Sequence, residues 1–311
     1  MQAKHENNAA SRVFHASVPD SDADIAAGLL HDPVGRMTDA PADTRVMSLM
    51  IHDRLDAAAL DRLPRLDAVI TRSDGHDHLP MAALRDRGVA AYHLGDYATQ
   101  SVATLAVSMV LALLHRIPEA VATTRAGAWD RSRLVGRHLT ELRLGVLGVG
   151  RIGGTVARHL QALGADVLGH DVRRIEDVPM EPDLHRFLAA CDVVTIHVPL
   201  QGDTRHLLDG AALAHMRRGS LLVNTARGDV VDPGAVLQAL DTGRLAGYAA
   251  DVLPGEPDPP HLEALLRPDV LLTPHLGAHN EATLRSRYER TQAIVDALLA
   301  GRPQDVEAWR V

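Results

Sequence analysis

One short stretch limits the possible folds more than any other feature of this sequence: residues 148–153 read GVGRIG. An apolar run at residues 144–147 precedes it. A helix-length segment at residues 155–163 follows, and then a second apolar run that ends at His170 and Asp171. A strand, a glycine-rich turn, a helix and a second strand in this order form the unit that binds a dinucleotide in a parallel α/β sheet.

Each glycine of the turn has a separate physical task. Gly148 permits the tight turn, Gly150 lets a pyrophosphate approach the backbone, and Gly153 allows close contact between helix and strand. The amides and the positive dipole end at the start of the helix, around Arg151 and Ile152, favour the phosphates. We therefore predict that these five residues bind a dinucleotide.

Asp171 indicates which dinucleotide is preferred. It follows Gly153 at close to the ~20-residue spacing of the acid that binds the ribose hydroxyls. Its carboxylate would repel the 2′-phosphate of NADP, so the sequence favours NAD. Arg173 and Arg174 lie just beyond and could hold that phosphate, which leaves NADP as the alternative.

The rest of the chain repeats the alternation of strands and helices. Near-continuous apolar strands separated by helices predict α/β structure with a doubly wound parallel sheet in the second half and a smaller α/β unit before it. We expect strands at residues 13–16, 46–51, 68–71, 89–92, 144–147, 166–168, 193–198, 221–223 and 270–272. We expect helices at residues 56–63, 80–87, 100–116, 118–126, 155–163 and 281–299.

Composition excludes several classes of protein. The chain has 311 residues, 46% of them hydrophobic, and a single Cys, which rules out a disulfide scaffold. Its formal charge of −8 disfavours nucleic acid as a ligand. The first ten residues lack a secretory apolar segment, and the most apolar stretch, residues 102–114, is shorter than a membrane span. We expect a cytoplasmic protein with no membrane contact and with Cys191 reduced and buried.

Three polar side chains follow strands of the second half, where open α/β sheets bind their ligands. Arg227 comes after the strand at residues 221–223, and His275 comes after the strand at residues 270–272. Glu256 lies in a Pro/Gly loop after a further short strand. These residue types suit the binding of a carboxylate and the transfer of a proton.

Several blocks in order resemble the D-isomer-specific 2-hydroxyacid dehydrogenases: residues 148–153, 191–200 with Thr204, 216–232, 251–257 and 273–277. The resemblance covers nearly the whole chain. It implies a doubly wound (Rossmann) NAD-binding domain of residues 95–274 inserted into a smaller flavodoxin-like α/β substrate domain of residues 1–94 plus 275–311.

The same resemblance implies roles for individual residues. Arg227 anchors the substrate and polarises its keto oxygen, His275 is the acid/base, and Glu256 orients His275 and favours its imidazolium form. The residues that contact the cofactor are then Gly148, Gly150, Arg151, Ile152, Gly153, Asp171, His197, Val198, Pro199, Thr204, Thr225, Ala226, Asp251, His275 and Gly277.

A loop in the first half is expected to receive the substrate. The resemblance implies that the amides of Asp74 and Gly75 bind the substrate carboxylate, and that Tyr97 contributes with Arg227. The carboxylate of Asp74 should disfavour a phosphate ester or phosphite. Asp74 with His76 and His78 could instead suggest a metal site, but no fourth ligand accompanies them, and we predict no metal.

We therefore predict an NAD-dependent oxidoreductase that moves a hydride between NADH and a small 2-keto acid to give the D-2-hydroxy acid. The alternative is an NAD-sensing protein-interaction module like the C-terminal-binding corepressors, which would make no special use of the Arg, Glu and His. Formate oxidation needs no such His–Glu pair. The resemblance also suggests a homodimer, with the apolar helix at residues 102–114 near the interface.

Overall fold

The computed structural model describes residues 13–311, so the N-terminal segment considered above lies outside the described residues. The chain divides into two compact units: unit 1, residues 1–97 and 280–311, and unit 2, residues 98–279. These divisions fall three and five residues beyond the predicted domain boundaries at 94/95 and 274/275. The functional roles of the two units, in cofactor and in substrate binding, remain a proposal.

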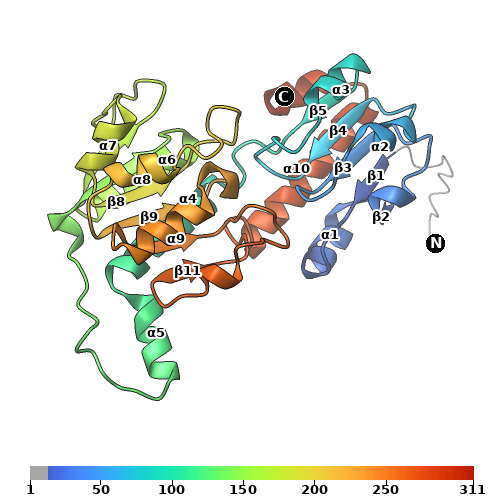
Figure 1. The fold of residues 1–311 in the computed structure, drawn as a ribbon. Helices are drawn as coiled ribbons and strands as arrows, with labels where there is room; N and C mark the ends of the chain where they lie inside the picture. Colours follow the sequence, from blue (N-terminus) through green and yellow to red (C-terminus); the bar gives the residue numbers. More distant parts are fainter. Residues whose placement is uncertain (1–12) are drawn as a thin grey trace. The chain divides into compact units, whose positions relative to one another are not determined.

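Unit 1 is a five-stranded parallel sheet in the order β2-β1-β3-β4-β5, which is the flavodoxin-like order. Helices cover both faces of the sheet (Figure 1). The strands are β1 Val13–Ala16, β2 Val34–Gly35, β3 Val46–Leu49, β4 Ala68–Thr71 and β5 Ala90–Tyr92. The helices are α1 Ala23–Leu29, α2 Ala57–Asp61, α3 Met81–Asp86 and α10 Glu281–Leu299, with the 3₁₀ segment η6 Pro303–Trp309 near the end of the chain.

Unit 2 is a six-stranded parallel sheet in the order β11-β10-β9-β8-β6-β7. The strand order reverses between β6 and β8, and ligands of doubly wound sheets bind at the carboxyl ends of strands beside such a reversal. The strands are β6 Arg143–Leu147, β7 Asp166–His170, β8 Val193–Ile196, β9 Ser220–Asn224, β10 Leu245–Ala250 and β11 Val270–Leu272. The helices are α4 Thr99–Leu114, α5 Ile117–Arg125, α6 Arg151–Ala162, α7 Leu184–Ala190, α8 Gly210–His215 and α9 Pro233–Asp241.

The core of unit 2 explains why its central strands are mostly apolar. One face of the sheet packs against α4 and α6, and the other packs against α7, α8 and α9. Every residue of β8 and β9 is buried as a result. Cys191 lies in this core, where burial raises the pKa of its thiol to about 12, so the residue behaves as a small apolar side chain.

Helix α4 differs from its predicted description in one respect. We expected a helix that is apolar nearly all round, but Gln100, Thr104 and Ser108 form an exposed polar strip, and the apolar side chains are largely buried within unit 2. Val102, Leu105, Leu111 and Ala112 of this helix are only partly buried, and a subunit interface near it stays a prediction.

No single helix among residues 13–311 is long and apolar enough to cross a membrane. Helices α4 and α5 reach the required length and composition only when taken together, across a bend of 65°.

Candidate active site

The glycine turn between β6 and α6 is packed too closely for side chains. Gly148 has a φ of +90°, and a Cβ on it would lie 2.7 Å from the backbone nitrogen of Val198. A Cβ on Gly153 would lie 1.9 Å from the carbonyl oxygen of Gly148. Both positions therefore require glycine for steric reasons, as the motif predicts.

Gly150 is different, because a Cβ there would meet no described atom within 4 Å. It caps the N-terminus of α6, whose first two residues are Arg151 and Ile152. A backbone with open space beside it, at the N-terminus of a twelve-residue helix, fits the pyrophosphate of a dinucleotide.

Two buried polar atoms nearby also fit a bound cofactor. Among the described residues, Nδ1 of His197 and Oγ1 of Thr225 are buried without a hydrogen-bond partner. The other ring nitrogen of His197 lies 2.9 Å from Oγ1 of Thr195, and burial lowers the pKa of His197 to about 3. His197 is therefore a neutral hydrogen-bonding group, and both residues belong to the predicted cofactor set.

Asp171 lies at the end of β7, beside the glycine turn. Its Oδ2 accepts a hydrogen bond of 2.8 Å from the Val149 amide, and its Oδ1 accepts one of 2.9 Å from the Arg173 amide. The Arg173 side chain also lies 3.6 Å from Oδ1. Asp171 is thus fixed against the turn, and the nearest arginine is paired with it.

The remaining predicted cofactor residues follow β8 and β9. Thr204 closes the loop after β8: its hydroxyl donates to the carbonyl of Pro199 at 2.7 Å and accepts from the Gln201 amide at 2.7 Å. Val198 touches Gly148, as described above. Ala226 follows β9, and its amide donates to the side chain of Asn224 at 3.0 Å.

Arg227 lies in a turn directly after β9. The Asn224 side-chain amide donates to the Arg227 carbonyl at 2.9 Å, so Asn224 holds both ends of this turn. The next residue, Gly228, is in such close contact with the chain after β10 that a Cβ would lie 2.1 Å from the Leu253 carbonyl carbon. This contact brings the Arg227 turn against the segment that leads to Glu256.

Glu256 and His275 form a hydrogen-bonded pair. Nδ1 of His275 lies 2.7 Å from Oε2 of Glu256, and Oε1 of Glu256 accepts a hydrogen bond of 2.8 Å from the Leu253 amide. Both carboxylate oxygens are therefore engaged, which fixes the carboxylate and, through it, the imidazole ring. Nδ1 faces the carboxylate, so Nε2 is the ring nitrogen on the side away from Glu256.

Asp251, at the end of β10, organises the turn that carries His275. Its carboxylate accepts hydrogen bonds from the Thr273 hydroxyl, from the Leu276 amide at 2.7 Å and from the Gly277 amide at 2.8 Å. The His275 amide donates to the Asp251 carbonyl at 2.9 Å, and His275 itself has a φ of +55°. Asp251 is predicted to contact the cofactor, and in this structure it also shapes the turn of residues 273–277.

The predicted substrate loop lies in unit 1, directly after β4. The Asp74 carboxylate is 3.6 Å from Nδ1 of His93, and the Gly75 carbonyl accepts a hydrogen bond of 2.6 Å from the Ser73 hydroxyl. Tyr97 lies under the guanidinium of Arg287, 5.8 Å from the ring centre. Within residues 13–311 no group of three or more His, Cys, Asp or Glu side chains is placed to hold a metal ion.

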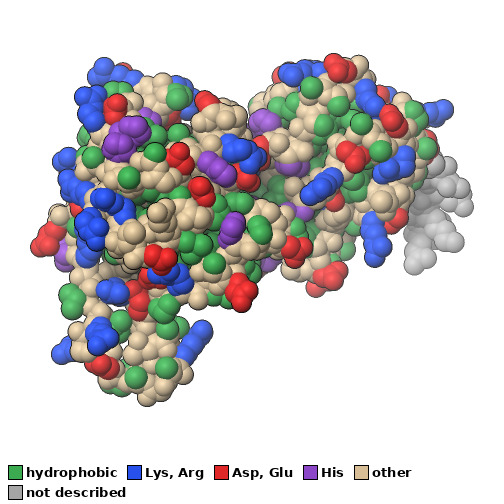
Figure 2. All heavy atoms as spheres, in the orientation of Figure 1, with side chains coloured by type: hydrophobic (Ala, Val, Ile, Leu, Met, Phe, Trp, Pro, Cys, Tyr) green, Lys and Arg blue, Asp and Glu red, His purple; other side chains and the backbone are tan. Residues whose placement is uncertain are grey.

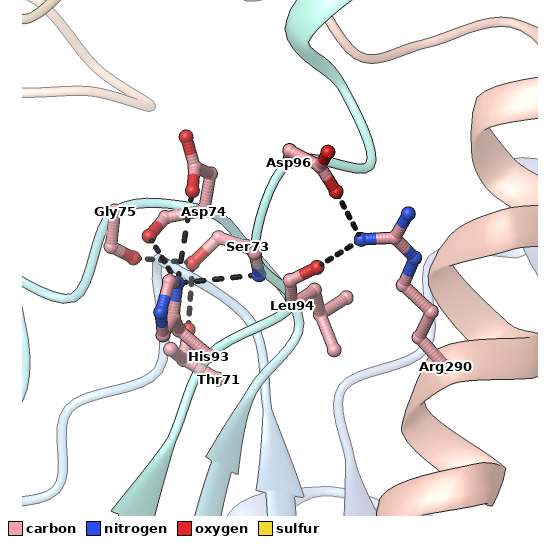
Figure 3. Close-up of polar contacts among 9 residues, drawn as sticks. Thr71, Ser73, Asp74, Gly75, His93, Leu94, Asp96 and Arg290 are labelled. Atoms are coloured by element: carbon pink, nitrogen blue, oxygen red, sulfur yellow. Dashed lines mark hydrogen bonds and ion pairs between the residues drawn. The ribbon is translucent and has the colours of Figure 1, made fainter. Parts of the chain in front are cut away.

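Two residues that hold this loop, Ser73 and His93, were not among the predicted site residues. The Ser73 hydroxyl bonds the Gly75 carbonyl, and the His93 ring bonds the Asp74 carbonyl (Figure 3). Neither is part of a recognisable motif, and only their neighbourhood to the predicted carboxylate loop could have drawn attention to them.

Comparison with known proteins agrees with this geometry. Residues 107–277 match the model of the D-isomer specific 2-hydroxyacid dehydrogenase, NAD binding domain. The glyoxylate reductase of Thermofilum pendens is 35% identical over 83% of this chain and 78% of its own length. The D-3-phosphoglycerate dehydrogenase of Haemophilus influenzae is 33% identical over 78% of this chain but only 60% of its own length.

Solved structures of other proteins have the same fold over nearly the whole length of this chain. The D-lactate dehydrogenase of Aquifex aeolicus, solved with NAD and lactic acid, has a TM-score of 0.88 and 28% identity, covering 96% of this chain and 98% of its own. An NADPH-dependent glyoxylate/hydroxypyruvate reductase of Sinorhizobium meliloti, solved with NADP and malonate, has a TM-score of 0.83 and 25% identity, covering 93% and 94%.

The chain therefore belongs to the D-isomer specific 2-hydroxyacid dehydrogenase family. It has an NAD(P)-binding domain and the two-sheet α/β fold of that family, as predicted. It is an oxidoreductase of this family, whose members use NAD or NADP.

Proposed function

We propose that the protein reduces a small 2-keto acid with NADH to the D-2-hydroxy acid, and catalyses the reverse reaction. One observation supports this proposal above the others: Nδ1 of His275 lies 2.7 Å from the Glu256 carboxylate. Both residues and Arg227 follow the carboxyl ends of neighbouring strands of the unit 2 sheet. A carbonyl reduction needs a proton donor and a cation that orients the carboxylate and keto oxygen, and these side chains supply both.

In this mechanism each side chain has one task. Arg227 binds the substrate carboxylate and keto oxygen with its planar fork and polarises the carbonyl. His275 donates the proton on Nε2 to the keto oxygen, and it takes the proton back in the oxidative direction. Glu256 holds the ring and stabilises the imidazolium. The nicotinamide cofactor, when bound, supplies the hydride, and the residues predicted to hold it are those around the glycine turn and after β8 and β9.

The direct test is a panel of 2-keto acids, including glyoxylate and pyruvate, offered with NADH or NADPH while nicotinamide absorbance is followed. We expect NADH to be oxidised with at least one small keto acid. Oxidation of neither cofactor with any keto acid would contradict the proposal and favour the NAD-sensing interaction module.

The substrate is proposed to lack a second strong negative charge. Asp74 places a carboxylate in the loop that is proposed to bind the substrate carboxylate, so a phosphate ester would meet repulsion there. We therefore propose small unphosphorylated keto acids as the substrate class, in contrast to the D-3-phosphoglycerate dehydrogenases among the relatives.

We expect Asp171→Ala to change the cofactor preference. The carboxylate that would repel a 2′-phosphate is removed, and Arg173 loses its partner, so it is free to meet that phosphate. The KM for NADH should rise about tenfold, while the KM for NADPH should fall. Steady-state kinetics with both cofactors measure the ratio, and Asp166→Ala, which breaks an exposed Asp–Arg pair at the opposite end of β7, is the matched control. A wild-type protein that prefers NADPH would refute the assignment.

We expect a homodimer in solution, with its contact on α5 and the segment that follows. This part of unit 2 extends away from the sheet, and hydrophobic atoms lie on its surface (Figures 1 and 2). Trp129 is 95% exposed and Val135 is 77% exposed, and exposed apolar surface of this kind marks an interface.

Light scattering should therefore give a mass near twice 33.4 kDa. Trp129→Asp should shift the mass towards the monomer, whereas Leu266→Asp, the same kind of change at an exposed position elsewhere in unit 2, should not. A monomeric wild-type protein at micromolar concentration would rule the dimer out.

A further inference from the structure

Three successive carbonyls of the loop after β4, those of Ser73, Asp74 and Gly75, are held by hydrogen bonds. The Ser73 carbonyl accepts a hydrogen bond from the Leu94 amide at 3.0 Å, and the Gly75 carbonyl accepts one from the Ser73 hydroxyl at 2.6 Å. The Asp74 carbonyl lies 3.1 Å from Nδ1 of His93. Figure 3 shows these contacts converging on the loop from the segment after β5 and from within the loop itself.

The direction of these carbonyls fixes the direction of the amides. In a planar trans peptide the N–H of a residue points opposite to the C=O of the residue before it. The N–H groups of Asp74, Gly75 and His76 therefore point away from the bonds that hold the carbonyls. Backbone N–H groups of successive residues are a common binding site for an anion such as a carboxylate.

His93 makes the only one of these three bonds that comes from a titratable ring. Two oxygens of Asp74 surround its Nδ1, the carbonyl at 3.1 Å and the carboxylate at 3.6 Å, which favours a proton on that nitrogen. The Gly95 amide lies 3.3 Å from the same nitrogen and could donate only if that proton were absent. The shorter contact and the acceptor pair both favour Nδ1–H donating to the Asp74 carbonyl.

The ring of His93 is itself fixed in place. Its backbone amide donates to the Trp309 carbonyl at 2.9 Å, and the ring of His76 meets it edge-on with centroids 5.8 Å apart. A hydrogen bond from a fixed ring sets the orientation of the peptide between Asp74 and Gly75, which in turn aims the Gly75 amide.

The geometry points to His93 as a positioning residue for the substrate carboxylate: by bonding the Asp74 carbonyl at 3.1 Å, it aims the amide of Gly75. This inference rests on the proposed function, since it concerns the same keto acid. His93 directly follows β5 and acts on substrate binding through the loop, without contact to the reacting atoms.

The test compares three variants by steady-state kinetics with the keto acid that the panel identifies. His93→Ala removes the bond, and we expect the KM for the keto acid to rise about tenfold with kcat changed less than about twofold, the pattern of lost ground-state binding. His93→Asn keeps an N–H donor where Nδ1 stands and should restore most of the wild-type KM.

Arg290→Met is the matched control. Arg290 holds the same segment, through the Leu94 carbonyl at 2.7 Å and the Asp96 carboxylate at 2.8 Å, but it bonds none of the loop carbonyls (Figure 3). Its KM for the keto acid should stay near that of the wild type. An unchanged KM in His93→Ala, or an equal rise in Arg290→Met, would overturn the inference.

Binding of oxamate, a carboxylate that cannot be reduced like a keto acid, separates this inference from the proposed function. Calorimetry on the NADH-saturated protein should show about tenfold weaker oxamate binding in His93→Ala than in His93→Asn. If the wild type reduces no keto acid but oxamate binding still depends on His93, the proposed function fails and the inference stands. Equal oxamate binding in the two variants, or no binding to the wild type, contradicts the inference.

Discussion

His275→Ala should lower kcat for keto-acid reduction by about 10³-fold or more, because a positioned general acid contributes roughly 10²–10⁴ to the rate and Nε2 of His275 is the proposed donor. NADH binding, followed by nicotinamide fluorescence, should remain within about a few-fold of the wild type. The ring is 30% exposed and its loss opens no core cavity, so thermal stability should change little.

Glu256→Gln tests the same pair more gently. The substitution keeps the shape but removes the charge that stabilises the imidazolium, and it leaves one acceptor oxygen for two donors, Nδ1 of His275 and the Leu253 amide. We expect kcat to fall about 10-fold to 100-fold, clearly less than in His275→Ala. If Glu256→Gln has full activity while the chemical step limits the rate, the role of the pair in proton transfer is wrong, even though the 2.7 Å contact exists.

Arg227→Lys should lower kcat/KM for the keto acid by about 100-fold or more. Lysine keeps the charge but loses the planar fork that grips a carboxylate and a keto oxygen together, and a misplaced substrate reacts slowly. NADH binding should be nearly unchanged. Stopped-flow single turnovers separate the binding of the keto acid from the chemical step.

Arg205→Lys is the control, because it makes the same chemical change at an arginine with no proposed contact to the substrate. Arg205 pairs with Asp229 on the surface of the same unit, close in sequence to the cofactor loop but with no proposed contact to the substrate. Its kcat/KM should stay within about twofold of the wild type. If Arg227→Lys behaves like this control, Arg227 does not anchor the substrate.

The fold of unit 2 could be predicted well because its signals are local. Strands β6, β8 and β9 contain runs of buried, mostly apolar residues, and the spacing of the glycines after β6 predicts a tightly packed turn. Short elements gave weaker signals: α7 and α8 have seven and six residues, and neither was predicted individually. In unit 1 the two-residue strand β2 and the helix α1 were missed for the same reason.

The polar groups inside unit 1 could not have been predicted from the sequence. Arg72 is fully buried, and its guanidinium donates to Ser48 at 2.9 Å and to the carbonyls of Ala16 and Ser17. Arginine is almost never fully buried, and the partners come from strands far away in the chain, so no local pattern reveals the contact. His93 was missed for the same reason, because its role depends on which loop lies beside it.

The two ends of unit 2 are tied to each other. The Ser101 hydroxyl donates to the Gly277 carbonyl at 2.6 Å, although the two residues are 176 positions apart. A domain whose two ends lie close together can be inserted into a loop of another domain with little change in that domain's structure. A circular permutant of unit 2 that is opened elsewhere can therefore have its original ends joined by a short linker between residues 101 and 277.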